Sequence, residues 1–266
     1  MTEGIFNGVK LHYIERGSGN ETVLFLHGLL WDTRLYEPQY EALKDRYRCV
    51  AFDFRGQGQS EVTMTGFDMD TLYEDCVAFI ETLGIGACHV VGLSMGGFVA
   101  MRLAARRPDL VKSLILLETS CEVEPKVVSY RMLNFIARWF GFGPVINRVM
   151  PIMFGKTFMS DPEREALRKE LAQRIMNNHR VGITRAVRGV IDRLGIESEL
   201  ALIKAPTLIM VGDEDVGTVP QKAQHIHHLV QGSQLEIIKR AGHTSTLEEP
   251  EQVNQHLTTF LSQHAG

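Results

Sequence analysis

Cysteine is scarce in this sequence: there are four in 266 residues, and no two of them have the C-x-x-C spacing. So few cysteines cannot form the framework of a disulfide-stabilised domain. We therefore expect reduced, buried thiols, which suit a cytoplasmic protein. The four residues are Cys49, Cys76, Cys88 and Cys121.

Signals for export, membrane insertion and nucleic-acid binding are also missing. No apolar run approaches the roughly 20 residues that cross a bilayer. Residues 1–8 read MTEGIFNG, which has neither the basic nor the apolar region of a signal peptide. The net charge is -4, and this disfavours a nucleic-acid-binding protein, which would need a basic face. We predict a cytoplasmic protein that binds neither membranes nor nucleic acid.

The chain does contain a regular alternation of short apolar runs and segments with helical periodicity. Asn-Gly at residues 7–8 predicts a tight hairpin near the N-terminus. The predicted buried strands cover residues 23–26, 49–52, 89–91, 114–117, 207–211 and 235–238. The predicted helices cover residues 36–43, 72–83, 96–105, 221–229 and 252–261. Continuous apolar strands that alternate with helices indicate a parallel sheet covered on both faces.

One segment departs from this alternation. Residues 122–200 show helical patterning and no strand run. We predict that they form a helical cap over the carboxyl ends of the strands, where open α/β sheets bind ligands. The core is then formed by residues 1–121 and 201–266. Positive charges outnumber negative ones in the cap segment, which fits either a solvated helical surface or mild steering of anionic substrates.

The strongest local motif is G-x-S-x-G. Residues 92–96 read GLSMG, between an apolar run at 88–91 and the helix predicted at 96–105. A sharp strand-to-helix turn would hold Ser94 in a strained conformation with its Oγ exposed. Backbone N–H groups at the start of the helix point at a developing anion. Ser94 is therefore the predicted nucleophile.

A serine hydroxyl needs a base, and the base needs an orienting carboxylate. His243 follows the predicted strand 235–238 and is the expected base, which gives the chain order serine, acid, histidine. Asp215, in the loop after strand 207–211, is the expected acid because that loop should run beside the loop of His243. Three other carboxylates lie at strand ends: Asp213, Glu214 and Glu118. Asp213 and Glu118 are the alternatives to Asp215.

Acyl transfer also needs donors for the oxyanion of the tetrahedral intermediate. The backbone N–H of Met95, directly after Ser94, is one expected donor. The second is the N–H of Leu29, in the loop after strand 23–26. Each such donor contributes about 3 kcal/mol of transition-state stabilisation.

Taken together, these motifs resemble the α/β-hydrolase superfamily over essentially the whole chain. The matching segments are HG at 27–28, DFRGQGQS at 53–60, GLSMGG at 92–97, GDED at 212–215 and GH at 242–243. Within the superfamily, the sequence is similar to the 3-oxoadipate enol-lactonase-like esterases and lactonases. The resemblance implies the α/β-hydrolase fold, with a mostly parallel eight-stranded sheet flanked by helices and a helical cap insertion. It also implies no cofactor, and it places the acid at Asp215, the last residue of the pattern G-x-x-D.

Aromatic residues of the cap and of the oxyanion loop are candidates for the substrate pocket. We expect Trp31, which follows the oxyanion loop, to form part of the pocket wall. Phe135 and Trp139 in the cap segment are expected to line the pocket from the other side, because a cap that closes over a sheet leaves an apolar cleft.

A group of histidines at 225, 227 and 228 has the composition of a metal site. Only His225 and His228 would share a helix face, and no acid or cysteine lies nearby in the sequence at ligand spacing. We predict no metal site.

The leading functional hypothesis is a cytoplasmic serine hydrolase that cleaves small carboxylic esters or lactones through an acyl-enzyme on Ser94. A cofactor-free perhydrolase, of the haloperoxidase-like kind, is an alternative because its site looks nearly the same. A second alternative is a ligand-binding sensor on a hydrolase fold with little turnover, because fold alone does not determine function.

Overall fold

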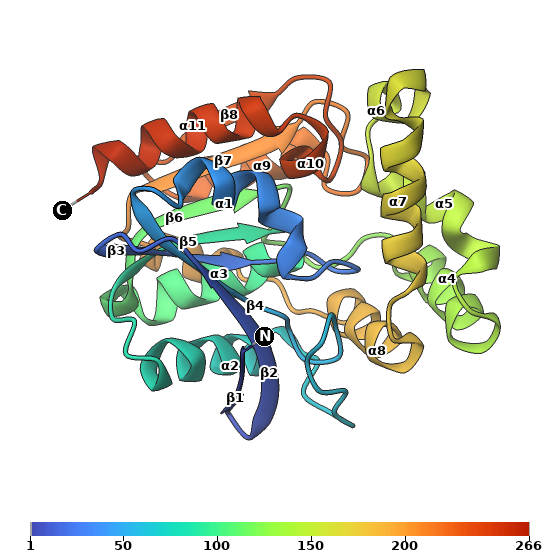
Figure 1. Cartoon of the computed structure of the whole chain (residues 1–266), viewed down its shortest axis with the longest axis horizontal. Coiled ribbons are helices and arrows are strands. Elements are labelled where there is room, and N and C mark those ends of the chain that lie inside the picture. The colour runs from blue at the N-terminus through green and yellow to red at the C-terminus, as the bar shows by residue number, and fades with distance from the viewer. Residues whose placement is uncertain (1, 266) are drawn as a thin grey trace.

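The computed structural model describes residues 2–265 and contains one eight-stranded sheet with helices on both faces (Figure 1). The strands are β1 Thr2–Phe6, β2 Val9–Arg16, β3 Glu21–Leu26, β4 Tyr47–Phe52, β5 Cys88–Leu93, β6 Val111–Leu117, β7 Thr207–Gly212 and β8 Gln234–Ile238. Their spatial order is β1-β2-β4-β3-β5-β6-β7-β8. β2 is antiparallel to both β1 and β4, and every other pair is parallel. The prediction of a mostly parallel eight-stranded sheet is confirmed.

The N-terminal hairpin turns where its sequence requires. Asn7 and Gly8 both have positive φ, at 48° and 73°, and these values suit the tight turn that matches the twist of two antiparallel strands. The pair connects β1 to β2, whose register pairs Phe6 with Val9.

Side chains of the central strands alternate between two apolar layers, because successive residues of a strand point to opposite faces. Leu24 and Leu26 belong to the layer packed against α2 (Met69–Thr82) and α3 (Met95–Arg106). Val23 and Phe25 belong to the layer packed against α1 (Glu37–Leu43) and α11 (Pro250–Gln263). Figure 1 shows α11 above the sheet and α2 below it. Both faces are buried, which is why these strands read as continuous apolar runs.

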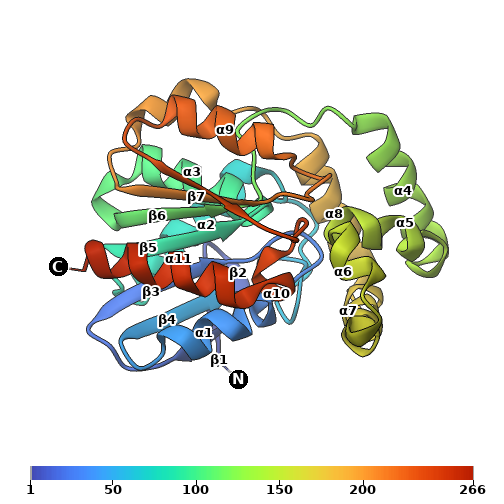
Figure 2. The ribbon, with the colours of Figure 1, turned by 90° about the horizontal axis from the view of Figure 1, so that it is seen from above.

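Between β6 and β7 the chain leaves the sheet and forms five helices at one end of it (Figure 2). These helices are α4 Val127–Phe140, α5 Gly143–Met153, α6 Lys156–Ser160, α7 Glu165–Met176 and α8 Arg180–Ile191. We refer to α4 to α8 as the helical layer. The chain then returns through the 3-10 helix η4 (Glu197–Leu202), whose Leu200 is buried in the same apolar layer as α3.

The remaining helical elements are short or lie after β7. They are α9 Pro220–Leu229, α10 Ser245–Glu248 and the 3-10 helices η1 Thr33–Tyr36, η2 Pro108–Leu110 and η3 Pro162–Arg164. Within residues 2–265, no helix combines the length and the apolar character needed to cross a membrane.

Candidate active site

Ser94 lies at the sharp turn between β5 and α3. Its φ is 52° and its ψ is -110°, a conformation that residues with a side chain rarely adopt. The turn brings helix and strands so close that a Cβ on Gly96 would lie 2.0 Å from the carbonyl oxygen of Leu26. Glycine is therefore required beside Ser94, and the strained backbone keeps the serine hydroxyl at the strand end.

His243 and Asp215 complete a chain of hydrogen bonds with Ser94. The Nε2 atom of His243 lies 2.9 Å from Ser94 Oγ. Its Nδ1 atom lies 2.9 Å from Asp215 Oδ2. The three residues come from the ends of β5, β7 and β8, which the parallel sheet places at one edge.

The Asp215 carboxylate is fixed by its own loop. Its Oδ1 accepts the backbone N–H groups of Gly217 at 2.7 Å and Thr218 at 3.0 Å. Its Oδ2 accepts the Thr218 hydroxyl at 2.8 Å, next to His243. These bonds hold the carboxylate in the orientation in which it meets the imidazole.

The two other acids of the same loop bind elsewhere. Asp213 Oδ1 accepts the backbone N–H of Arg240 at 2.8 Å. Glu214 accepts the backbone N–H and the hydroxyl of Thr157 in α6, at 2.7 and 2.6 Å. Of the three neighbouring carboxylates, the structure brings only Asp215 to His243.

Glu118, the other alternative acid, lies fully buried at the end of β6 with φ at 41°. Neither of its carboxylate oxygens has a well-formed hydrogen bond among residues 2–265, although the Ser245 side chain and the Gly212 backbone lie close to the carboxyl group and oppose the rise in its pKa. Burial raises the pKa of Glu118 well above its ordinary value, and the nearby charges of Asp215 and Glu248 raise it further. The structure thus favours a neutral Glu118 that does not hydrogen-bond to His243.

The pKa of His243 is shifted by opposing effects. Burial lowers it, because the charged imidazolium loses hydration, whereas the charge and the hydrogen bond of Asp215 raise it. The attraction to Asp215 prevails, and the pKa of His243 lies above its ordinary value.

Two backbone N–H groups are candidates for stabilising an oxyanion. Met95 is the first residue of α3, so its N–H has no partner within the helix. Leu29 lines the cavity beside Ser94. The next residue, Leu30, has φ at 73°, and its N–H donates to Gln57 Oε1 at 3.1 Å. Gln57 therefore anchors the loop that carries Leu29.

His27 has a structural role, because its ring forms hydrogen bonds with the backbone of two loops. Its Nδ1 lies 2.8 Å from the carbonyl oxygen of Gly28, and its Nε2 accepts the backbone N–H of Phe54 at 2.9 Å. Complete burial lowers its pKa, so the ring is neutral and joins two loops of the core.

A cavity of about 150 Å³ opens next to Ser94 and His243. Most of its wall is apolar and comes from the helical layer, for example from Leu133, Ile146 and Val187. Polar groups of the wall include an ion pair in which Arg193 Nη1 lies 3.0 Å from Glu124 Oε2. The cavity therefore accepts a small, mainly apolar group beside the serine hydroxyl.

The expected pocket positions of Trp31, Phe135 and Trp139 are wrong, because none of the three lines this cavity. Trp31 is buried in the core and packs edge-to-face against Phe154, with ring centroids 6.0 Å apart. Phe135 and Trp139 are 61% and 63% exposed and line a groove on the outer side of α4. A helix turns by about 100° per residue, so when Leu133 and Ala137 face the cavity, residues two positions later face away.

Glu248 is a site residue that the sequence analysis missed. Its buried carboxylate accepts the backbone N–H groups of Gly242 and Thr244, on both sides of His243, at 3.0 and 3.1 Å. It also accepts the N–H of Gly155, between α5 and α6, at 2.8 Å. Burial raises the pKa of Glu248 to about 7, although these three donors oppose the shift. The residue connects the histidine loop to the helical layer. Only its position five residues after His243, in a glutamate pair before proline, could have suggested it.

Among residues 2–265, one group of side chains could hold a metal ion, although the sequence analysis predicts no metal site. His225 lies close to Cys121 and Glu197, which are remote from it in the sequence. The sequence contains no acid or cysteine at ligand spacing from these histidines, and the three residues come together only in the fold.

Comparison with known proteins places these features in a family. The family described as alpha/beta hydrolase fold matches residues 21–250. The chain is 26% identical to 3-oxoadipate enol-lactonase 1 of Acinetobacter baylyi, over 90% of this chain and 88% of that protein. It superposes on the thermophilic esterase from Thermogutta terrifontis with a TM-score of 0.90 and 27% identity, over 99% of each chain. The enol-lactonase from Burkholderia xenovorans LB400 has a TM-score of 0.92 at 24% identity, over 98% of this chain and 100% of that one.

Proposed function

Because the chain belongs to the α/β-hydrolase family, we propose that it is a serine hydrolase that cleaves small carboxylic esters or lactones. The observation that carries the proposal is the hydrogen-bonded chain from Ser94 through His243 to Asp215, beside a mainly apolar cavity. A serine, a base and an orienting acid in this geometry are the components of acyl transfer.

The proposed reaction begins when Ser94 Oγ attacks the ester carbonyl and His243 Nε2 takes the hydroxyl proton. Asp215 holds the Nδ1 proton and stabilises the imidazolium that forms. The N–H groups of Leu29 and Met95 donate to the oxyanion. His243 then protonates the leaving alkoxide, and the acyl-enzyme remains. Water attacks the acyl-enzyme with His243 as its base, and Ser94 is released.

The apolar cavity supports a substrate with an apolar acyl group. Each buried methylene contributes about 0.8 kcal/mol of binding, so a cavity of this kind selects by chain length. A lactone fits the same scheme, because its ring-opened alcohol remains attached to the acyl group until hydrolysis. The likeness to an enol-lactonase and an esterase supports both substrate classes.

The proposal is tested with a panel of p-nitrophenyl esters and lactones, measured with wild type and with Ser94→Ala. A burst of p-nitrophenol equal to one acyl group per chain is expected if deacylation is slower than acylation. The same assays with and without peroxide distinguish a perhydrolase. Ester or lactone turnover that persists unchanged in Ser94→Ala would refute the proposal, and so would a complete lack of turnover on the panel.

We expect kcat/KM to rise with pH through a single group, because His243 accepts a proton only in its neutral form. The charge of Asp215 raises the pKa of His243, so the midpoint should lie above about 6.5. Asp215→Asn removes this attraction, and its residual activity should rise at lower pH than that of wild type. A rate that does not change between about pH 5 and 8 would contradict the role of His243.

We also expect the helical layer to control the choice of acyl group. Ile146→Ala enlarges the cavity and should shift kcat/KM ratios between ester lengths by about 1–3 kcal/mol in favour of longer chains. Trp139→Ala is the matched control, because Trp139 belongs to the same layer but lies outside the cavity. If only Trp139→Ala changed the length profile, the cavity beside Ser94 would not be the acyl site.

A further inference from the structure

Three potential metal ligands meet where the helical layer joins the core, outside the cavity of the candidate active site. Cys121 lies in the loop between β6 and the helical layer, and Glu197 opens η4 directly after that layer. His225 lies on α9, which packs against the sheet. None of the three lines the cavity beside Ser94.

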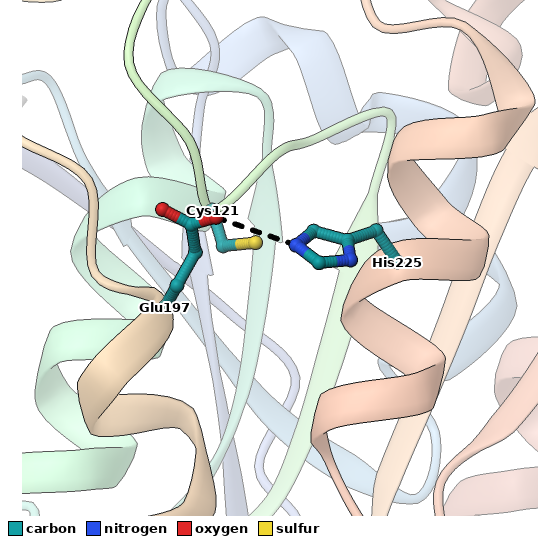
Figure 3. Close-up of side chains that lie close together, drawn as sticks. All are labelled: Cys121, Glu197 and His225. Carbon is teal, nitrogen blue, oxygen red and sulfur yellow. Dashed lines mark hydrogen bonds and ion pairs between the residues drawn. The ribbon is translucent and has the colours of Figure 1, made fainter.

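The donor atoms of these residues converge on one small space. The thiol sulfur, one carboxylate oxygen and one imidazole nitrogen all lie within 4.8 Å of one another. His225 Nε2 lies 3.4 Å from Glu197 Oε1. Figure 3 shows the Cys121 sulfur directed toward the same ring nitrogen. In the hydrogen-bonded chain of Ser94, His243 and Asp215, the two partners of the histidine bind to opposite nitrogens of its ring. Here both partners face one nitrogen, which suits a common ligand between them.

The backbone fixes the positions of these side chains. The N–H of Ile196 donates to the carbonyl oxygen of Cys121 at 2.8 Å, so the segments before and after the helical layer are held together. Cys121 is buried at 1% exposure, whereas the Glu197 and His225 side chains are 48% and 38% exposed. The sulfur therefore has a fixed place at the base of the site, and the other two donors can adjust to an ion that arrives from solvent.

We propose that Cys121, Glu197 and His225 form a site for a thiophilic divalent transition metal, with Zn²⁺ as the best fit. A sulfur, a nitrogen and an oxygen donor suit Zn²⁺, whereas Mg²⁺ and Ca²⁺ require oxygen ligands. The thiol proton leaves to solvent on binding, and a thiolate, a carboxylate and a neutral imidazole then balance the charge of the ion. The nearby cation Lys222 is already paired with Glu122, which reduces its repulsion of the ion.

The fit requires only small movements. Zinc bonds of about 2.0–2.3 Å in a tetrahedron place neighbouring donors roughly 3.3–3.8 Å apart, so rotations of the two exposed side chains close the remaining distance. Three protein ligands leave a fourth position for water. The bound ion would connect both ends of the helical layer to α9 and so restrain the layer over the sheet.

The test uses untagged full-length protein that has been stripped with a chelator and titrated with Co²⁺ as a spectroscopic substitute for Zn²⁺. We expect one Co²⁺ per chain, a thiolate-to-cobalt charge-transfer band, the visible bands of four-coordinate cobalt, and loss of all of these when Zn²⁺ is added. Zn²⁺ should also raise the melting temperature, because a ligand that binds the folded state stabilises it. The proposal is independent of hydrolysis, and ester turnover should be unchanged when the metal is stripped.

Variants identify the ligands. Cys121→Ser should abolish the charge-transfer band. His225→Ala and Glu197→Gln, at partly exposed positions, should each weaken Zn²⁺ binding at least about tenfold, since even the loss of a residue that only supports a ligand costs 10- to 100-fold. His228→Ala, one turn further along α9 and exposed, is the matched control and should bind as wild type does. A cobalt spectrum without a thiolate band, or equal Zn²⁺ affinity in His225→Ala and wild type, would overturn the proposal.

Discussion

Ser94→Ala is expected to lower kcat by about 10⁴-fold or more while the protein still folds. The substitution removes the proposed attacking oxygen and the 2.9 Å contact with His243, but it leaves the proposed oxyanion donors and the cavity in place. Alanine has a Cβ as serine does, so the strain at φ 52° is the same in both proteins. The loss should therefore fall on chemistry rather than on stability.

The measurement is steady-state hydrolysis of the best p-nitrophenyl ester, with a thermal melt of each protein. Covalent labelling by a fluorophosphonate should be complete in wild type and absent in Ser94→Ala. A purified variant that keeps a tenth of wild-type turnover would exclude the serine mechanism, whatever the labelling shows.

Asp215→Asn is expected to lower kcat by about 10⁴-fold near pH 7. An amide that keeps the hydrogen bonds from Gly217 and Thr218 to its oxygen presents its NH₂ group to His243 Nδ1. The imidazole must then carry its proton on Nε2, where it cannot accept the proton of Ser94. The imidazolium also loses its neighbouring charge. Both effects act on the chemical step, so the melting temperature should change much less than the rate.

Asp213→Asn and Glu118→Gln are the comparison variants. Asp213 binds the Arg240 backbone and not His243. Glutamine resembles the uncharged carboxyl group that the structure favours for Glu118. Both variants should therefore retain most of the activity. Glu118→Gln without activity, beside Asp215→Asn with nearly wild-type activity, would move the acid to β6. That result would leave the roles of Ser94 and His243 intact.

The order of strands and helices could be predicted from the sequence because each core strand is buried on both faces. Such strands contain uninterrupted apolar residues, as β7 does at residues 208–211, and the turns between them are marked by glycine. The ends of the strands were harder to predict. β6 begins at Val111, three residues before its predicted start, and the prediction missed these residues because the exposed Lys112 interrupts the apolar run.

The meeting of Ser94, Asp215 and His243 was also predictable, because the positions of these residues depend on local turns at strand ends. Their hydrogen bonds follow once a parallel sheet brings those ends together. The pocket was not predictable in the same way. Which face of α4 meets the cavity depends on how the helix is rotated against α5 and α8, and aromatic content does not reveal it. The exposed Phe135 and Trp139 show how apolar residues can occupy the outer face.

The convergence of Cys121, Glu197 and His225 could not be found from spacing. Metal-ligand motifs are recognisable when the ligands belong to one loop or helix. Here the ligands are separated by the whole helical layer and by β7, and only the fold brings them together.

The position of the helical layer between β6 and β7 has a consequence for the protein during its synthesis. β6 and β7 pair in the sheet, with Leu114 opposite Thr207, although the entire layer separates them in the chain. Closing so long a loop adds little free-energy cost, since each doubling of loop length costs only about 0.6 kcal/mol, but the pairing must wait until β7 has left the ribosome. Ser94, the proposed nucleophile, therefore emerges long before Asp215 and His243. A nascent or truncated chain that ends within the layer carries Ser94 without Asp215 or His243, so the proposed hydrolytic activity would arise only after translation has passed His243.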